Sequence, residues 1–157
     1  MIRPACPEDA PAIAEIWNRI IRDTIVTFTT AEKDPAAIAS AIADGAPYHV
    51  AADARGVLGF VTAFQFRGGP GYAHTFEHSI HIIPAARHRG LGRALMAAIE
   101  DDMRARHVHS LFAGVSGENE AGVTFHAALG YREVARLPEV GRKFGRWHDL
   151  VLMQKLL

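Results

Sequence analysis

The segment RHRGLGR, residues 87–93, carries the residue types that bind a phosphate group. Gly90 and Gly92 are flanked by basic side chains at positions 89 and 93, and from Leu91 onward the apolar residues recur at helical spacing. Glycine lets a ligand approach the backbone closely, and the first N–H groups of a helix have no partner within the helix. We therefore predict that this loop binds a pyrophosphate at a helix N-terminus, where the helix dipole also favours an anion.

The same loop has an alternative interpretation. Glycine and arginine also occur together in solvated turns before helices, so a surface turn explains residues 87–92 without a ligand. No early strand is followed by GxGxxG with an acidic residue about twenty positions later, and no GxxxxGK[ST] motif is present. A Rossmann dinucleotide site and a P-loop nucleotide site are therefore both disfavoured.

His126 is a candidate for proton transfer. It lies in the predicted helix 119–129, four residues before Gly130. A neutral imidazole accepts or donates a proton near pH 7, so His126 has the chemistry of an acid or a base. The alternative is a histidine that only packs this helix against a sheet.

The spacing of apolar and turn-forming residues predicts the elements that position these groups. We expect helices over residues 7–21, 34–45, 91–107 and 119–129, and strands over residues 2–6, 48–52, 57–66, 72–83, 110–115, 131–137 and 147–156. The segment 22–33 has no sustained period and is predicted to be a loop that walls a binding site. This order predicts one α/β domain over residues 1–157, with a mixed, mostly antiparallel central sheet and helices on both faces.

Composition limits the partners of such a domain. The formal net charge is zero, which gives no reason to expect nucleic acid binding. The chain is 49% hydrophobic and 22% charged, as in soluble globular proteins, and its apolar runs are too short to span a membrane. Residues 1–9 lack the apolar core of a secretory signal. We expect a cytoplasmic protein with no nucleic acid or membrane partner.

Cysteine and histidine usage gives no sign of a metal site. The single Cys6 cannot form an internal disulfide, and we expect it to be a buried structural thiol. The nine histidines show neither CxxC nor HExxH spacing. We therefore expect no metal.

Three further stretches give the chain a family resemblance. They are YAHTFEHSIHII (72–83), NEAGVTFHAALGY (119–131) and VGRKFGRWHDLVLMQ (140–154). With the [QR]-x-x-G-x-[GA] pattern of residues 87–92, they resemble the GNAT superfamily of N-acetyltransferases, and within it the phosphinothricin and methionine sulfoximine N-acetyltransferase group. The predicted element order is similar to the GNAT fold over essentially the whole chain. The resemblance implies acetyl-CoA as cosubstrate and a homodimer with the late strands near the interface.

The resemblance also implies roles for individual residues. Glu77, in a motif of the form T-[VF]-E-x-S, is implied to be the general base for the substrate amine, and burial should raise its pKa for that task. An ordinary strand-edge carboxylate is the alternative. His126 stands where many members have a tyrosine that protonates the CoA sulfur. The expected cofactor-binding residues are His81, Ile82, Ile83, Arg87, His88, Arg89, Gly90, Leu91, Gly92, Arg93 and Asn119. The expected substrate-binding residues are Phe28, Arg67, Tyr72 and Glu77.

The chain departs from the family pattern on the substrate side. Gly69 stands where a second arginine is usual, His81 replaces a usual tyrosine, and the usual tryptophan of the second helix has no counterpart. The cofactor motif is intact. The implied function is therefore an acetyl-CoA-dependent N-acetyltransferase that acts on the primary amine of a small amino-acid-like substrate by direct attack in a ternary complex.

Other functions remain as alternatives. The amine could belong to a polyamine, an antibiotic or a protein N-terminus. From other classes, the chain could be a non-catalytic acyl-CoA sensor or a structural interaction domain.

Overall fold

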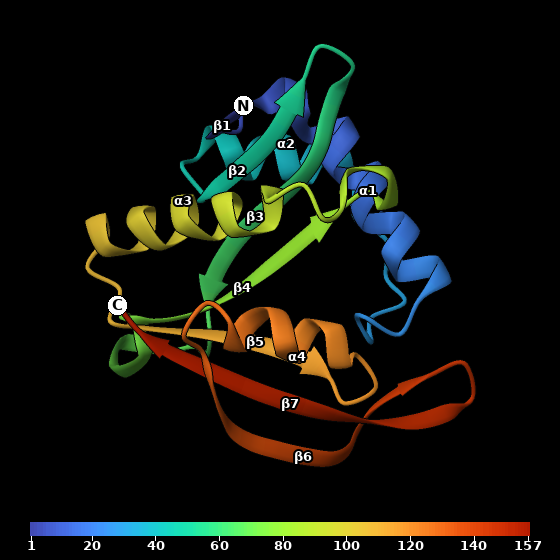
Figure 1. Cartoon of the computed structure of the whole chain (residues 1–157). Coiled ribbons are helices and arrows are strands. Elements are labelled where there is room, and N and C mark those ends of the chain that lie inside the picture. The colour runs from blue at the N-terminus through green and yellow to red at the C-terminus, as the bar shows by residue number, and fades with distance from the viewer.

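Seven strands form one mixed sheet (Figure 1). The strands are β1 (Ile2–Pro4), β2 (Tyr48–Asp53), β3 (Gly56–Gln65), β4 (Thr75–Ile82), β5 (Ser110–Ser116), β6 (Arg132–Lys143) and β7 (Arg146–Leu156). Their order in the sheet is β1-β2-β3-β4-β5-β7-β6, and only the β4–β5 pair is parallel. This computed structural model describes residues 1–157 and confirms the prediction of a mostly antiparallel sheet.

Helices cover both faces of the sheet, as predicted. The four longer helices are α1 (Ala10–Asp23), α2 (Pro35–Ala43), α3 (Leu91–Ala105) and α4 (Glu120–Ala127), and three short 3-10 helices are η1 (Pro7–Asp9), η2 (Pro70–Tyr72) and η3 (Pro84–Ala86). One core joins α1 and α2 to β2 and β3, and the other joins α3 and α4 to the opposite face. Figure 1 shows α3 and α4 in front of the sheet and α1 and α2 behind it. No helix is long and apolar enough to cross a membrane.

Successive side chains of β4 point to opposite faces of the sheet. Ile80 and Ile82 pack against the core beneath α3 and α4. Glu77 and His81 lie on the other face, because neighbouring residues of a strand point in opposite directions. The His81 ring centroid accordingly lies 6.1 Å from that of Trp17 in α1.

Strands β4 and β5 separate after a short paired segment. Their parallel pairing runs only from Thr75 opposite Ser110 to His78 opposite Ala113, although both strands continue. Figure 1 shows the two strands diverging toward the side on which α1 ends. The sheet therefore contains an opening lined by strand edges that no neighbouring strand pairs.

Two predicted strand boundaries are wrong. The strand predicted from Tyr72 begins at Thr75, and Tyr72 instead ends η2. Pro70 cannot donate a backbone hydrogen bond and Gly69 adopts φ +100, so the chain turns here before it can join the sheet. The first strand ends at Pro4 instead of Cys6, and Cys6 is exposed at the turn into η1, contrary to the buried thiol that was expected.

The predicted break between the last two strands is also wrong. The glycines and charges of residues 140–146 suggested a long turn, but β6 runs to Lys143 and the turn contains only Phe144 and Gly145. These two residues have φ of +51 and +75, the conformation of a tight hairpin turn. A register shift between Leu137 and Gly141 accommodates Pro138 within the strand.

Candidate active site

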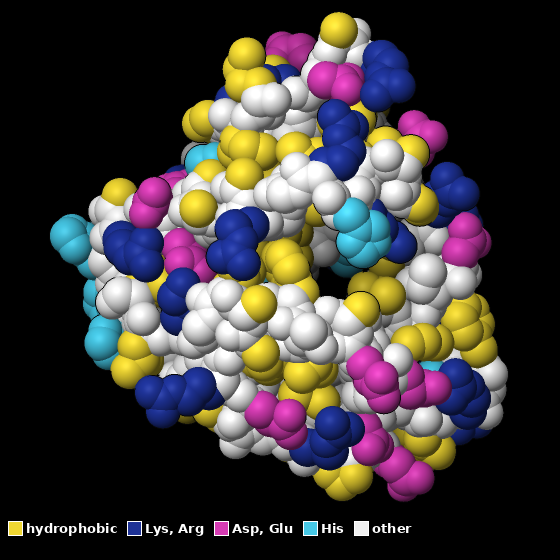
Figure 2. Space-filling model, in the orientation of Figure 1, with side chains coloured by type: hydrophobic (Ala, Val, Ile, Leu, Met, Phe, Trp, Pro, Cys, Tyr) yellow, Lys and Arg dark blue, Asp and Glu magenta, His cyan; other side chains and the backbone are white.

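A cavity of about 880 Å³ occupies the opening between β4 and β5. Figure 2 shows a deep hollow near the middle of the molecule, bordered by hydrophobic side chains and, on one side, by histidine and basic side chains. Eight residues predicted from the sequence line the cavity: Phe28, Glu77, His81, Ile82, Arg87, Gly92, Asn119 and His126. The fold therefore brings together the predicted base, the second proton-transfer candidate and part of the predicted phosphate loop.

Glu77 lies in the cavity, next to a glycine of β5, Gly114. A Cβ atom at Gly114 would lie 2.7 Å from Glu77 Oε1, so the absence of a side chain at Gly114 makes room for the carboxyl group. Burial alone raises the pKa of Glu77 above its ordinary value, with no charged or hydrogen-bonding partner to oppose the effect. A half-buried carboxyl group of this kind is suited to accept a proton.

His126 presents one free ring nitrogen. Its Nδ1 lies 2.7 Å from the carbonyl oxygen of Gly122, and because a carbonyl only accepts, Nδ1 carries the hydrogen. Burial lowers the pKa of His126, although the bond to Gly122 acts in the opposite direction. The ring is therefore neutral near pH 7, and its Nε2, which is buried without a partner, has a lone pair that can accept a proton.

His78 is a neighbour of His126 that sequence reasoning missed. The two ring centroids are 5.1 Å apart, and the Tyr131 ring lies 5.7 Å from His78. Burial lowers the pKa of His78 well below its ordinary value, and neither of its ring nitrogens has a partner. Because neighbouring residues of a strand point to opposite faces, His78 lies on the face of β4 away from Glu77. Only the tertiary structure shows that α4 brings His126 next to His78.

The predicted phosphate loop ends where α3 begins, at Leu91, as the helical spacing predicted. His88 and Gly90 adopt φ of +60 and +77, and no side chain caps the N-terminus of α3. The basic side chains of Arg87, Arg89 and Arg93 are exposed around it. The first N–H groups of α3 are thus available to an anion with positive charge nearby.

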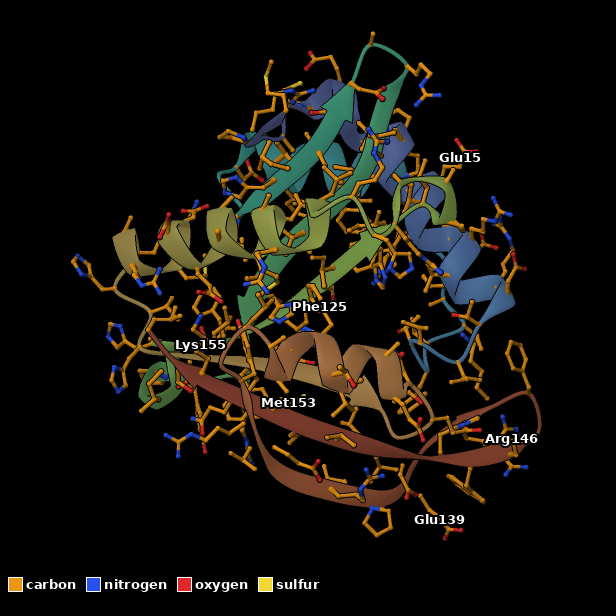
Figure 3. All side chains as sticks on the ribbon, in the orientation of Figure 1. Glu15, Phe125, Glu139, Arg146, Met153 and Lys155 are labelled. Carbon is orange, nitrogen blue, oxygen red and sulfur yellow. The ribbon has the colours of Figure 1, made fainter.

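Gly92 serves a different purpose from Gly90. A Cβ atom at Gly92 would lie 3.0 Å from the Phe125 ring, so this glycine allows α3 and α4 to approach closely. Figure 3 shows Phe125 on the side of α4 that faces α3. The contact closes one side of the cavity, which both residues line.

The backbone of β4 offers one free edge to the cavity. The Ile83 N–H donates to Leu58 at 2.9 Å and therefore points toward β3. The Ile82 carbonyl points the other way and accepts from Arg87 Nε at 3.4 Å. Of the three residues expected to bond a ligand through their backbone, Ile82 is the one whose backbone faces the opening.

Asn119 combines a structural role with a free donor. Its Oδ1 accepts from the Gly122 N–H at 3.0 Å and caps α4. The side-chain nitrogen is left for another acceptor, and Asn119 lines the cavity.

The loop after α1 forms a wall of the cavity, as predicted, and the β6–β7 hairpin holds it. Phe28 stacks on His148 with ring centroids 5.4 Å apart, and Lys143 Nζ donates to the carbonyls of Thr24 and Thr27 at 2.6 and 2.8 Å. A Cβ atom at Gly141 would overlap the Phe28 ring. Nothing in the local sequence links these two segments, which are more than 100 residues apart.

Comparison with known proteins identifies the family. Residues 13–131 match the acetyltransferase (GNAT) family. The chain is 35% identical to a phosphinothricin N-acetyltransferase of Streptomyces coelicolor, over 99% of this chain and 95% of that protein. The chain is a GNAT-family acetyltransferase.

Two further relatives support this assignment. An L-methionine sulfoximine/L-methionine sulfone acetyltransferase of Salmonella typhimurium is 34% identical, over 98% of this chain and 92% of that protein. A Salmonella typhimurium acetyltransferase structure with its cofactor acetyl-CoA has a TM-score of 0.93 and 33% identity, covering 100% of this chain and 93% of that chain. The likeness therefore extends over the whole fold.

Two predicted substrate residues of this acetyltransferase lie outside the cavity lining. Arg67 and Tyr72 are exposed in the segment between β3 and β4, with the guanidinium group 5.5 Å from the ring centroid. Their role in substrate binding stays a prediction. Six predicted cofactor residues also lie outside the lining, which are Ile83, His88, Arg89, Gly90, Leu91 and Arg93.

No group of three or more histidine, cysteine, aspartate or glutamate residues is arranged in this acetyltransferase to hold a metal ion.

Proposed function

We propose that residues 1–157 form one N-acetyltransferase domain that acetylates the primary amine of a small amino-acid-like substrate, of the phosphinothricin, methionine sulfoximine or methionine sulfone type. The observation that carries this proposal is the half-buried carboxyl group of Glu77, which has no partner and faces a cavity where β4 and β5 diverge. Relatives with these named substrates match over nearly the full chain, which supports the substrate class.

The residues around the opening fit acetyl-CoA. The exposed Arg87, Arg89 and Arg93 surround the uncapped N-terminus of α3, which suits a pyrophosphate. The backbone edge of β4 at Ile82, which no strand pairs, and the side-chain nitrogen of Asn119 suit the amide groups of an extended arm. When bound, acetyl-CoA supplies an acetyl group already activated as a thioester.

Two groups of this chain accept protons in the proposed mechanism. Glu77 takes a proton from the substrate ammonium, directly or through water, and its raised pKa places it closer to that of the proton donor. His126 provides a second acceptor at Nε2. The only cysteine, Cys6, is outside the cavity, so the lining supports direct attack by the amine in a ternary complex instead of a cysteine-bound acetyl group.

A thiol-release assay tests the proposed function. Purified protein is incubated with acetyl-CoA and, in turn, phosphinothricin, methionine sulfoximine and methionine sulfone, and free CoA is measured. We expect CoA release with at least one of them and N-acetylated product by mass spectrometry. Release only with polyamines or peptides would contradict the substrate class, and acetyl-CoA binding without release for any amine would indicate a sensor.

A further inference from the structure

Two cationic side chains, Lys33 and Arg87, line the cavity, and they come from different segments of the chain. Arg87 bonds the Ile82 carbonyl beside the phosphate loop. Lys33 belongs to the wall formed by the loop after α1. The only carboxylate in the lining is Glu77, so the cavity holds one anion, one cation next to the cofactor loop, and one cation on the loop after α1.

The Lys33 ammonium group has no carboxylate partner. It lies 4.7 Å from the centroid of the Trp17 ring, and Trp17 also lines the cavity. The contact with the ring face favours the charge but leaves the N–H donors of the ammonium available to oxygen acceptors. The Lys33 ammonium group, in the cavity lining and without a carboxylate partner, is therefore available to an anionic group of a ligand.

The backbone at Lys33 is held in place by α1. Asn18 Oδ1 accepts from the Lys33 N–H at 2.7 Å, and Asn18 Nδ2 donates to the Lys33 carbonyl at 3.0 Å. The other end of the same loop is held by Lys143 and by the stacking of Phe28 on His148. The backbone that carries the Lys33 side chain is therefore fixed before a ligand arrives, and the Trp17 ring is the contact of the ammonium group itself. A fixed backbone reduces the entropy lost on binding.

Arg67 does not offer an equivalent charge. It lies in an exposed turn outside the cavity lining, and the nearby position 69 is a glycine. Within the lining, Lys33 is the cation that is not engaged with the cofactor loop.

We propose that Lys33 is a specificity-determining residue that binds an anionic group of the amine substrate, either a carboxylate or a phosphinate. The pairing is complementary, because Lys33 attracts the anion while Glu77 attracts the ammonium group of the same zwitterionic molecule. This inference rests on the proposed function and names the group that the cavity selects.

Paired variants and substrates test this inference. Lys33→Met removes the charge at similar length, Lys33→Arg keeps it, and Arg19→Met removes a charge from the exposed side of α1 as the matched control. Each is assayed with phosphinothricin, methionine sulfone and the neutral α-carboxamide of methionine sulfone. Calorimetry measures acetyl-CoA binding, and it measures amine binding in the presence of unreactive CoA.

We expect Lys33→Met to raise KM and the amine Kd for anionic substrates by about 10- to 100-fold, the range of a lost charge-assisted hydrogen bond. Lys33→Arg should restore most of the affinity, and Arg19→Met should match the wild type. Losses with both amino acids but not with the carboxamide would identify a carboxylate as the bound group. A loss confined to phosphinothricin would identify the phosphinate.

Three results would overturn the inference: no loss, an equal loss with the neutral carboxamide, or a loss of acetyl-CoA affinity with the amine Kd unchanged. Failure of the proposed function is a separate result. It would show as no thiol release by the wild type, and the comparison of amine Kd values in the presence of CoA would still decide the role of Lys33.

Discussion

The carboxyl group of Glu77 occupies a place that disfavours its charge. Burial raises its pKa, so the folded chain holds this proton more tightly than the unfolded chain does. Stability therefore falls as pH rises from the ordinary glutamate pKa through the raised value, and above that the loss stays constant. The group that we propose to be the base thus lowers stability at neutral pH.

Glu77→Gln is expected to separate the catalytic effect of this carboxyl group from its effect on stability. General bases contribute about 10²- to 10⁴-fold, so kcat should fall by that order while the melting temperature at pH 7 rises. In the wild type, kcat/KM should decline with acidity at a pH above the ordinary glutamate pKa. Calorimetric melting and a pH–rate profile measure both. A variant that loses activity and melting temperature together would contradict this account.

Gly114 is expected to control where that carboxyl group lies. In Gly114→Ala the new Cβ would lie 2.7 Å from Glu77 Oε1 and would displace the flexible end of the side chain. Misplacement of a catalytic group by about 1 Å can cost about 100-fold, so kcat should fall by about 10- to 100-fold with little change in melting temperature. Gly71→Ala, where a Cβ meets nothing within 4 Å, is the matched control. Full activity in Gly114→Ala would argue against Glu77 as the base.

At the scale of elements, the wall of the cavity depends on the β6–β7 hairpin. Gly141→Ala would force the Phe28 ring away from its place on His148, because the added methyl group would overlap it. Overpacking of this kind costs about 1–3 kcal/mol, and the displaced wall should raise KM for the amine more than the Kd for acetyl-CoA. Steady-state kinetics and calorimetry would show the difference. Gly68→Ala provides the control, since its Cβ meets nothing within 4 Å, and an unchanged amine KM in Gly141→Ala would contradict the proposed coupling.

Changes at the N-terminus of α3 should affect the binding of acetyl-CoA and not the binding of the amine. Arg89→Ala removes an exposed charge beside the uncapped helix, so acetyl-CoA binding should weaken by about 3- to 10-fold and depend less on salt. Titration calorimetry at two ionic strengths tests this, with the remote exposed Arg132→Ala as control. Equal Kd values for Arg89→Ala and the wild type would rule out the predicted pyrophosphate contact.

At the scale of the whole molecule, the β6–β7 hairpin exposes several large apolar side chains. Val134, Val140, Phe144 and Trp147 are each more than half exposed. Apolar side chains gathered on one hairpin are typical of an interface. We therefore retain the prediction of a homodimer through the late strands.

Sedimentation velocity tests this prediction directly. The wild type should sediment as a dimer at micromolar concentration, and Val140→Glu should shift it toward monomer because a charge at an apolar interface is costly to desolvate. Tyr72→Glu, at an exposed side chain outside the hairpin and outside the cavity lining, is the control. A wild type that stays monomeric would contradict the prediction.

The sequence by itself determined the features that depend on neighbouring residues. Helical spacing after Leu91, glycines at 90 and 92, and the run of residues 72–83 after a turn predicted the phosphate loop, its helix and the strand that carries Glu77, because these are local properties of the backbone. Local turn-forming residues also gave a wrong prediction. The strand was predicted to end at residue 137, but a register shift in β6 accommodates Pro138 and the strand continues.

Only the tertiary structure decided which distant residues share the cavity. It places Gly114 beside Glu77, His126 against His78, and the loop that carries Lys33 between α1 and the last hairpin. Such contacts join segments tens to more than 100 residues apart, and the packing of whole elements fixes them. The sequence therefore indicated the cofactor side, which one local loop largely encodes, while the substrate side depended on how the sheet opens and what closes over it.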